Sequence, residues 1–243
     1  MRYRKVRPKT IEEIGREWDL LGDTRNLQIA SGGDLSFSQL LMPEIIHRLR
    51  DLPEGDSVLD VGSGTGHLAE RIAERGLSVV GVDPSLRSVA IARDNASNAV
   101  FHAVSVQDFA KLSSEKFEVA VSNMVLMDAP DLLGVLHAVS SLLAPEGRFI
   151  STITHPLFWP RYWGYESAEW FDYLEETFIE GDFKIASQST PHVSTHIHRP
   201  ISAYVNGLVA SGFRITELRE LVSSSNVTVK YPRFLLLDAV KVR

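Results

Sequence analysis

The 243-residue sequence contains no cysteine, which excludes disulfides, thiolate metal sites and cysteine nucleophiles. It contains no apolar run of membrane-spanning length, and no apolar segment follows the basic residues 1–9, so we expect no secretory signal, no membrane partner and a cytoplasmic location. An excess of positive charge is also missing. The net charge of −6 argues against a nucleic-acid partner, which would favour a basic surface.

The composition is otherwise that of a soluble globular protein, with 44% hydrophobic and 23% charged residues. The informative stretch is 57–83. An apolar strand runs into a turn with glycines at Gly62, Gly64 and Gly66, and a helical pattern and a second apolar strand follow, ending at Asp83. A strand, a glycine turn, a helix, a strand and an acid form the layout of a nucleotide-type site, in which the acid binds a ribose diol.

Two residues bear on which nucleotide this site would accept. The dinucleotide fingerprint requires a third glycine where this sequence has His67. The carboxylate of Asp60, just before the turn, would repel a diphosphate, whereas it suits a cofactor that carries an ammonium and a sulfonium. A nicotinamide oxidoreductase is therefore disfavoured. A glycine turn that serves only strand–helix packing is the alternative.

This stretch resembles motif I and the following acidic strand end of class I S-adenosylmethionine-dependent methyltransferases. Residues 200–242 resemble the closing helix and antiparallel hairpin of small-molecule members, the type 11 or type 12 group. The resemblance implies an α/β fold, doubly wound, with a seven-stranded mostly parallel sheet. It also implies S-adenosylmethionine as the cofactor and a small-molecule acceptor methylated on oxygen or nitrogen.

The resemblance also implies which residues bind the cofactor. Asp60 and the turn would hold its amino-acid portion, Asp83 its ribose, and Val106 and Gln107 its adenine. Asn123 ends the strand predicted at 117–122 and would lie beneath the reacting groups. The full cofactor-binding set is Asp60, Gly62, Ser63, Gly64, Thr65, Gly66, Asp83, Pro84, Val106, Gln107, Asp108 and Asn123.

Two members of this set have simpler explanations. Ser105 stands where many relatives have an aspartate, so adenine recognition falls to backbone groups at Val106 and Gln107 or to the carboxylate of Asp108. Asp108 could equally cap its own loop, and Asn123 could simply form a turn at a strand end.

Residues 155–199 form an insertion too long for a routine connection, and they hold three of the four tryptophans. Long inserts at this point cover the acceptor in many small-molecule methyltransferases, so the resemblance implies a lid with aromatic walls. The predicted substrate-binding residues are Trp18, Phe158, Trp159, Trp163 and Tyr165. A homodimer surface or a satellite core is the alternative for the insert, and an ordinary packing role is the alternative for Trp18.

Histidines flank the insert and suggest a general base, because an acceptor hydroxyl must lose its proton and histidine titrates near neutrality. His155 follows the strand predicted at 149–154 and is the first candidate. His198 is the second, and it shares a strand face with His196. Structural hydrogen bonding is the alternative for each. No metal site is expected, because no carboxylate stands in register with these imidazoles.

The predicted organisation is a single methyltransferase domain. It comprises an N-terminal helical cap at 1–50, a cofactor-binding core at 51–154, the lid insert at 155–199, and a C-terminal helix and antiparallel hairpin at 200–243. Within the cap, Thr10 and Glu13 form a capping box, residues 19–33 read as a loop, and 35–49 as a helix. An RNA-modifying methyltransferase and a non-catalytic nucleotide-binding scaffold remain as alternative functions.

Overall fold

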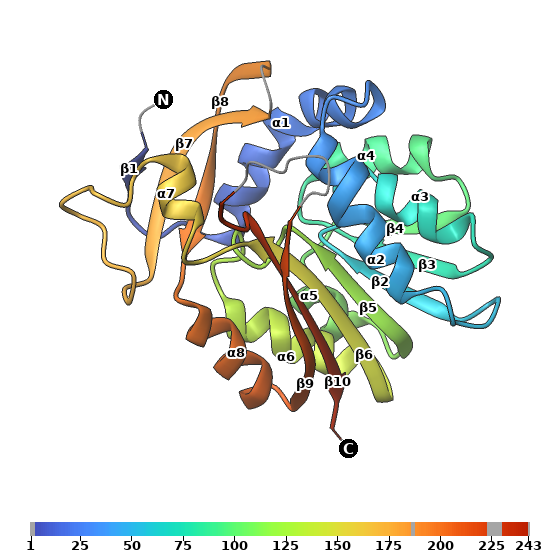
Figure 1. The fold of residues 1–243 in the computed structure, drawn as a ribbon. Helices are drawn as coiled ribbons and strands as arrows, with labels where there is room; N and C mark the ends of the chain where they lie inside the picture. The colour runs from blue at the N-terminus through green and yellow to red at the C-terminus, as the bar shows by residue number, and fades with distance from the viewer. Residues whose placement is uncertain (1–2, 186–187, 223–229, 243) are drawn as a thin grey trace.

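The computed structural model describes residues 3–185, 188–222 and 230–242. A seven-stranded sheet forms its centre (Figure 1). In spatial order its strands are β4 (Ala99–His102), β3 (Ser78–Val82), β2 (Ser57–Val61), β5 (Phe117–Asn123), β6 (Leu143–Thr154), β10 (Phe234–Lys241) and β9 (Phe213–Leu221). The first five are parallel, and β10 runs antiparallel to both neighbours. The predicted fold class, including the closing hairpin, is confirmed.

Helices cover both faces of this sheet. On one face lie the π-helical turn η1 (Phe37–Leu41), α2 (Met42–Arg48), α3 (His67–Ala73) and α4 (Leu86–Asn95). On the other lie α5 (Val106–Leu112), α6 (Leu132–Leu142) and α8 (Ile201–Ala210). Alternate side chains of each strand point to opposite faces, so Leu235 and Leu237 join one core while Phe234 and Leu236 join the other.

The order of the strands fixes where a ligand can bind. The chain passes from β2 outward to β3 and β4, then returns to β5 and continues outward to β6 on the other side. The loops after β2 and β5 therefore diverge, which leaves a crevice at the carboxyl ends of these strands. In open α/β sheets this switch point is the ligand site.

A second sheet of three strands stands beyond that edge. It consists of β1 (Arg4–Lys5), β7 (Thr177–Ile185) and β8 (Gln188–His198), all antiparallel. Between the sheets lies the short helix α7 (Trp159–Trp163), beside the small sheet in Figure 1. The segment 155–199 thus holds regular structure that its irregular sequence pattern did not indicate.

The prediction of a loop at 19–33 was wrong, because α1 (Ile11–Ala30) is one continuous helix. Its capping box at Thr10 and Glu13 forms as expected. Gly22 allows close packing on α4, since a Cβ there would lie 3.3 Å from the Arg87 side chain. Tertiary packing therefore outweighs the weak local helix propensity. Of the helices in the described ranges, none has the length and apolar character needed to cross a bilayer.

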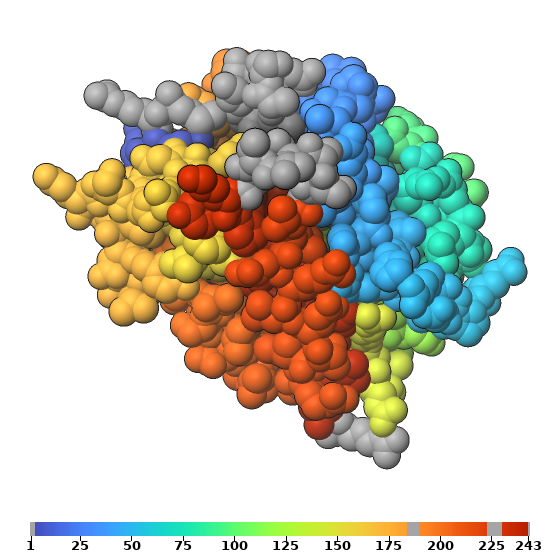
Figure 2. Space-filling model, in the orientation of Figure 1, coloured from blue at the N-terminus to red at the C-terminus, as the bar shows by residue number. Residues whose placement is uncertain are grey.

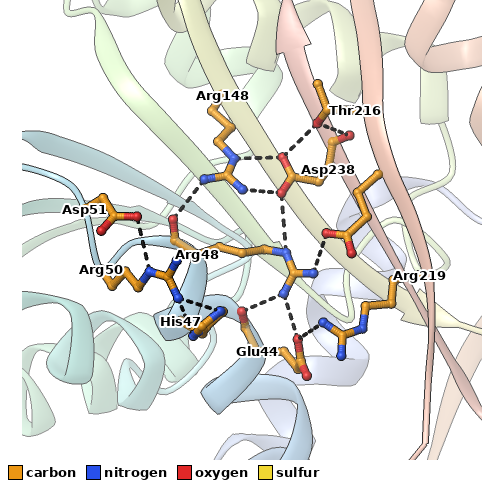
Figure 3. A network of polar contacts seen from close by, with 10 residues as sticks. Glu44, His47, Arg48, Arg50, Asp51, Arg148, Thr216, Arg219 and Asp238 are labelled. Carbon is orange, nitrogen blue, oxygen red and sulfur yellow. Dashed lines mark hydrogen bonds and ion pairs between the residues drawn. The ribbon is translucent and has the colours of Figure 1, made fainter.

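A charged cluster connects β6, β10 and β9, at one edge of the large sheet, to α2 (Figure 3). The carboxylate of Asp238 in β10 is 1% exposed and accepts two hydrogen bonds from Arg148 of β6. Arg48 of α2 lies 3.4 Å from the same carboxylate and 2.5 Å from Glu217 of β9. On the face shown in Figure 2, β9 therefore lies against α2.

Candidate active site

A cavity of about 340 Å³ lies at the carboxyl ends of β2, β3 and β5. Its floor comes from the loops that follow these strands. Its remaining walls come from α1, η1, α7, β8 and the start of β10. The large sheet therefore supplies one half of the cavity, while the N-terminal segment and the insert supply much of the other.

The glycine turn shapes the floor. Gly64 has φ +51°, and a Cβ added there would meet nothing within 4 Å, so the backbone is open to the cavity. Its amide donates to Oδ2 of Asp83 over 2.9 Å, and the amide of Ser85 donates to Oδ1 over 2.8 Å. Asp83 therefore holds the turn in place while it lines the cavity.

Two carboxyl groups, the buried Asp60 and the half-buried Asp83, give the floor its electrostatic character. Asp60 is 1% exposed, and its Oδ2 has no hydrogen-bond partner in the described part of the chain; the same holds for Oγ of Ser63. Burial, with Asp83 nearby, raises the pKa of Asp60 to about 7. Burial also raises the pKa of Asp83 to about 6, although two backbone amides oppose the shift. A cationic ligand would favour ionisation of both groups.

Most of the predicted cofactor-binding residues line this cavity: Asp60, Gly62, Ser63, Gly64, Thr65, Asp83, Pro84, Val106, Gln107 and Asn123. Gly66 and Asp108 lie outside it. Gly66 packs against α4, where a Cβ would lie 2.9 Å from Ala92. Asp108 bonds Ser105 and Lys111, each over 2.8 Å, and so belongs to the start of α5.

The predicted base candidates lie away from the cavity lining. His155 packs on Phe158, and its Nε2 lies 3.2 Å from Glu220. Nε2 of His198 lies 3.0 Å from the carbonyl of Tyr173. Burial lowers the pKa of both imidazoles. His196 does line the cavity, and burial beside His198 lowers its pKa to about 3, which keeps its ring neutral.

The aromatic candidates divide in the same way. Trp18, Trp159 and Trp163 line the cavity. Phe158 instead stacks on Tyr231, and Tyr165 packs against Trp170 and Phe171.

Sequence reasoning did not select four charged residues that line the cavity: Arg25, Asp34, Asp128 and Arg233. Arg25 pairs with Asp34 over 2.7 Å. Burial, together with the charge of Glu17, raises the pKa of Asp128 well above its usual value, although Arg199 opposes the shift. No local motif marks these residues. They lie far from the glycine turn in the sequence, so no pattern connects them with the site.

A comparison with protein families decides the assignment, because the model of a methyltransferase domain matches residues 35–216. The chain belongs to this methyltransferase family. Its family and fold are those that the class I resemblance predicted.

Solved structures of low sequence identity share the fold of this methyltransferase. A putative S-adenosylmethionine-dependent methyltransferase from Listeria monocytogenes is 22% identical, with a TM-score of 0.66 over 83% of this chain and 98% of that one. The 1,6-didemethyltoxoflavin-N1-methyltransferase of Burkholderia thailandensis is 18% identical, with a TM-score of 0.62 over 99% of this chain and 95% of that one.

Among curated proteins, the methyltransferase matches the ubiquinone biosynthesis O-methyltransferase of Actinobacillus pleuropneumoniae serotype 5b (strain L20). The two are 33% identical over 112 residues, which is 42% of this chain and 48% of the relative. The matched region thus spans about half the length of that curated relative.

Proposed function

We propose that this methyltransferase transfers a methyl group from S-adenosylmethionine to a hydroxyl of a small-molecule acceptor in the cavity described above. The observation that carries the proposal is the buried carboxyl of Asp60, whose Oδ2 has no hydrogen-bond partner among the described residues and lies beside an open glycine turn. An unsatisfied buried polar atom is costly unless a ligand pairs with it. The ammonium group of the cofactor is such a partner.

The lining residues fit the cofactor along its whole length. Asp60, Ser63 and the backbone at Gly64 would hold the amino-acid portion, and Asp83 the ribose hydroxyls. Val106 and Gln107 also line the cavity and would flank the adenine. When bound, the cofactor supplies a methyl group already activated by a sulfonium.

The protein's own contribution is then positioning and exclusion of water. Two reactants held at near-attack distance in a closed site react far faster than in solution. The walls from α1 and α7, including Trp18 and Trp159, would form this dry enclosure. Asn123, at the end of β5, would lie where the cofactor and the acceptor meet.

A hydroxyl acceptor must also release a proton. We assign its acceptance to Asp128, which lines the cavity and whose raised pKa makes its carboxylate a stronger base than usual. The ring of His196 is a weaker base because burial lowers its pKa. We assign His155 and His198 to supporting positions, since both bond neighbouring groups outside the cavity lining. The name of the curated relatives supports methylation on oxygen.

Two measurements test this proposal. Calorimetry with S-adenosylmethionine and with reduced nicotinamide dinucleotide should show binding of the first alone. Methyl-labelled cofactor, incubated with a cell extract, should then label molecules below about 1 kDa rather than RNA. Labelled RNA would favour the RNA-modifying alternative. Cofactor binding without any transfer would favour the non-catalytic scaffold.

A further inference from the structure

Arg233, the residue that precedes β10, lines the cavity. Its guanidinium carbon lies 5.1 Å from the ring centre of Tyr162 and 5.4 Å from that of Phe234. It donates hydrogen bonds to Oη of Tyr162 over 3.0 Å and to Oγ of Ser36 over 3.3 Å. The side chain is therefore held in place by neutral groups.

No carboxylate among the described residues pairs with Arg233, and the residues outside those ranges contain no aspartate or glutamate. Arg25, the other arginine in the described lining, is already neutralised by Asp34 over 2.7 Å. A guanidinium has five donors, and two partners leave several of them unused. The end of the cavity near Arg233 therefore carries a positive charge available to a ligand.

The position of Arg233 in the sheet points to the acceptor rather than the cofactor. The cofactor residues cluster at β2, β3 and the start of α5, whereas β10 lies two strands beyond β5 on the opposite side. A row of neighbouring aromatic rings, called the ladder below, runs along the cavity from His196 to Tyr162, which lies next to Arg233. His196 lies 5.6 Å from Trp163, which lies 5.1 Å from Trp159, which in turn lies 5.2 Å from Tyr162 beneath Arg233.

We propose that the acceptor is a flat aromatic carboxylic acid whose carboxylate binds Arg233 and whose ring lies along Trp159 and Trp163. This inference rests on the proposed function, because it names the acceptor of the same cavity. A planar guanidinium held by stacking is preorganised to bind a carboxylate through two parallel hydrogen bonds. The rings of the ladder supply the flat apolar surface that an aromatic acceptor needs.

The test uses hydroxylated aromatic carboxylates matched with their neutral amides: salicylate with salicylamide, and caffeate with caffeamide. Binding to the full chain saturated with S-adenosylhomocysteine is measured by calorimetry. We expect at least one carboxylate to bind about tenfold or more tightly than its amide. Arg233→Gln should remove that preference, and Arg233→Lys should restore part of it.

Arg161→Gln is the matched control, because Arg161 stacks on the exposed ring of Tyr231 and is not part of the cavity lining. It should leave the preference unchanged. The inference is wrong if no carboxylate binds, if amides bind equally well, or if Arg233→Gln weakens both members of a pair alike. It is also wrong if Arg233→Gln weakens S-adenosylhomocysteine binding instead. Failure of the wild-type chain to bind S-adenosylhomocysteine would instead contradict the proposed function.

Discussion

Gly66 lies against Ala92 of α4 so closely that an added Cβ would come within 2.9 Å of its Cα and Cβ atoms. Gly64, two residues earlier, faces open space in the cavity. The two glycines of one turn therefore serve different ends. One allows the helices to pack, and the other leaves room for a ligand.

Alanine at these two positions should separate the roles. Gly66→Ala, with its φ of +83° and a steric clash, should lower the free energy of unfolding by about 2–4 kcal/mol. Gly64→Ala should cost only about 1 kcal/mol of stability, yet weaken S-adenosylhomocysteine binding about tenfold or more. Thermal unfolding and calorimetry measure the two effects. Unchanged affinity in Gly64→Ala would contradict the placement of the cofactor.

Cofactor affinity should depend on pH through Asp60 and Asp83. The pKa values of about 7 and about 6 mean that both carboxyls gain protons as the pH falls from 7.5 to 5.5, and a neutral acid attracts an ammonium less strongly. The dissociation constant of S-adenosylhomocysteine should therefore rise over this range. Asp60→Asn should bind more weakly at pH 7.5 and show a flatter profile. If the dissociation constant of the wild-type protein does not change with pH, this assignment is wrong.

The same carboxyl should destabilise the unliganded protein at alkaline pH. The pKa of Asp60 is raised in the folded state, so its contribution to stability is present below its unfolded pKa near 3.8 and is lost as the pH rises through about 7. Asp60→Asn should exceed wild type by about 1–2 kcal/mol at pH 5 and by about 4 kcal/mol at pH 8. Urea unfolding at both values measures the difference. Equal stability at pH 8 is the contrary result.

Asp128→Asn should reduce turnover of a hydroxyl acceptor about a hundredfold or more, because proton transfer by a positioned base contributes at least that much. Cofactor affinity should stay unchanged. The controls are His155→Gln and His198→Gln, which should retain turnover within a few-fold once corrected for folded protein. If either control abolishes turnover while Asp128→Asn does not, the base is a histidine and our assignment is wrong.

The charged cluster around Asp238 should matter for stability and not for methyl transfer. Asp238→Asn leaves the buried Arg48 and its neighbour Arg148 without their shared carboxylate, which should cost about 3–5 kcal/mol. Glu217→Gln removes a partner whose side chain is 41% exposed and should cost at most about 1 kcal/mol. Denaturant unfolding compares the two. Similar losses would show that the network is not centred on Asp238.

The proposed cofactor half of the site was predictable because it is local in sequence. The strand, the glycine turn and the acid lie within residues 57–83, and backbone geometry dictates their residue types. Gly66 and Asp108 were placed in the cofactor-binding set with their neighbours, yet they lie outside the cavity lining. The reason is that a turn and a cap also need such residues for their own packing and hydrogen bonds.

The proposed acceptor half was less predictable because distant segments build it. Arg233, Asp128 and His196 come from a strand start, a loop and a second sheet, and no spacing rule links them. The prediction of a loop at 19–33 was wrong for a related reason. This polar segment has little helical pattern of its own, and its helix is stabilised by packing on α4.

Lys9 joins Glu17 of α1 to Glu180 of β7 and Thr195 of β8, with bonds of 2.7 Å to the last two. The opening segment and the insert are thus bonded to each other, although 171 residues separate Lys9 from Glu180 in the chain. Swapping 155–199 alone between related proteins would leave these partners mismatched. A transplant of acceptor preference would have to carry residues 3–30 along with the insert.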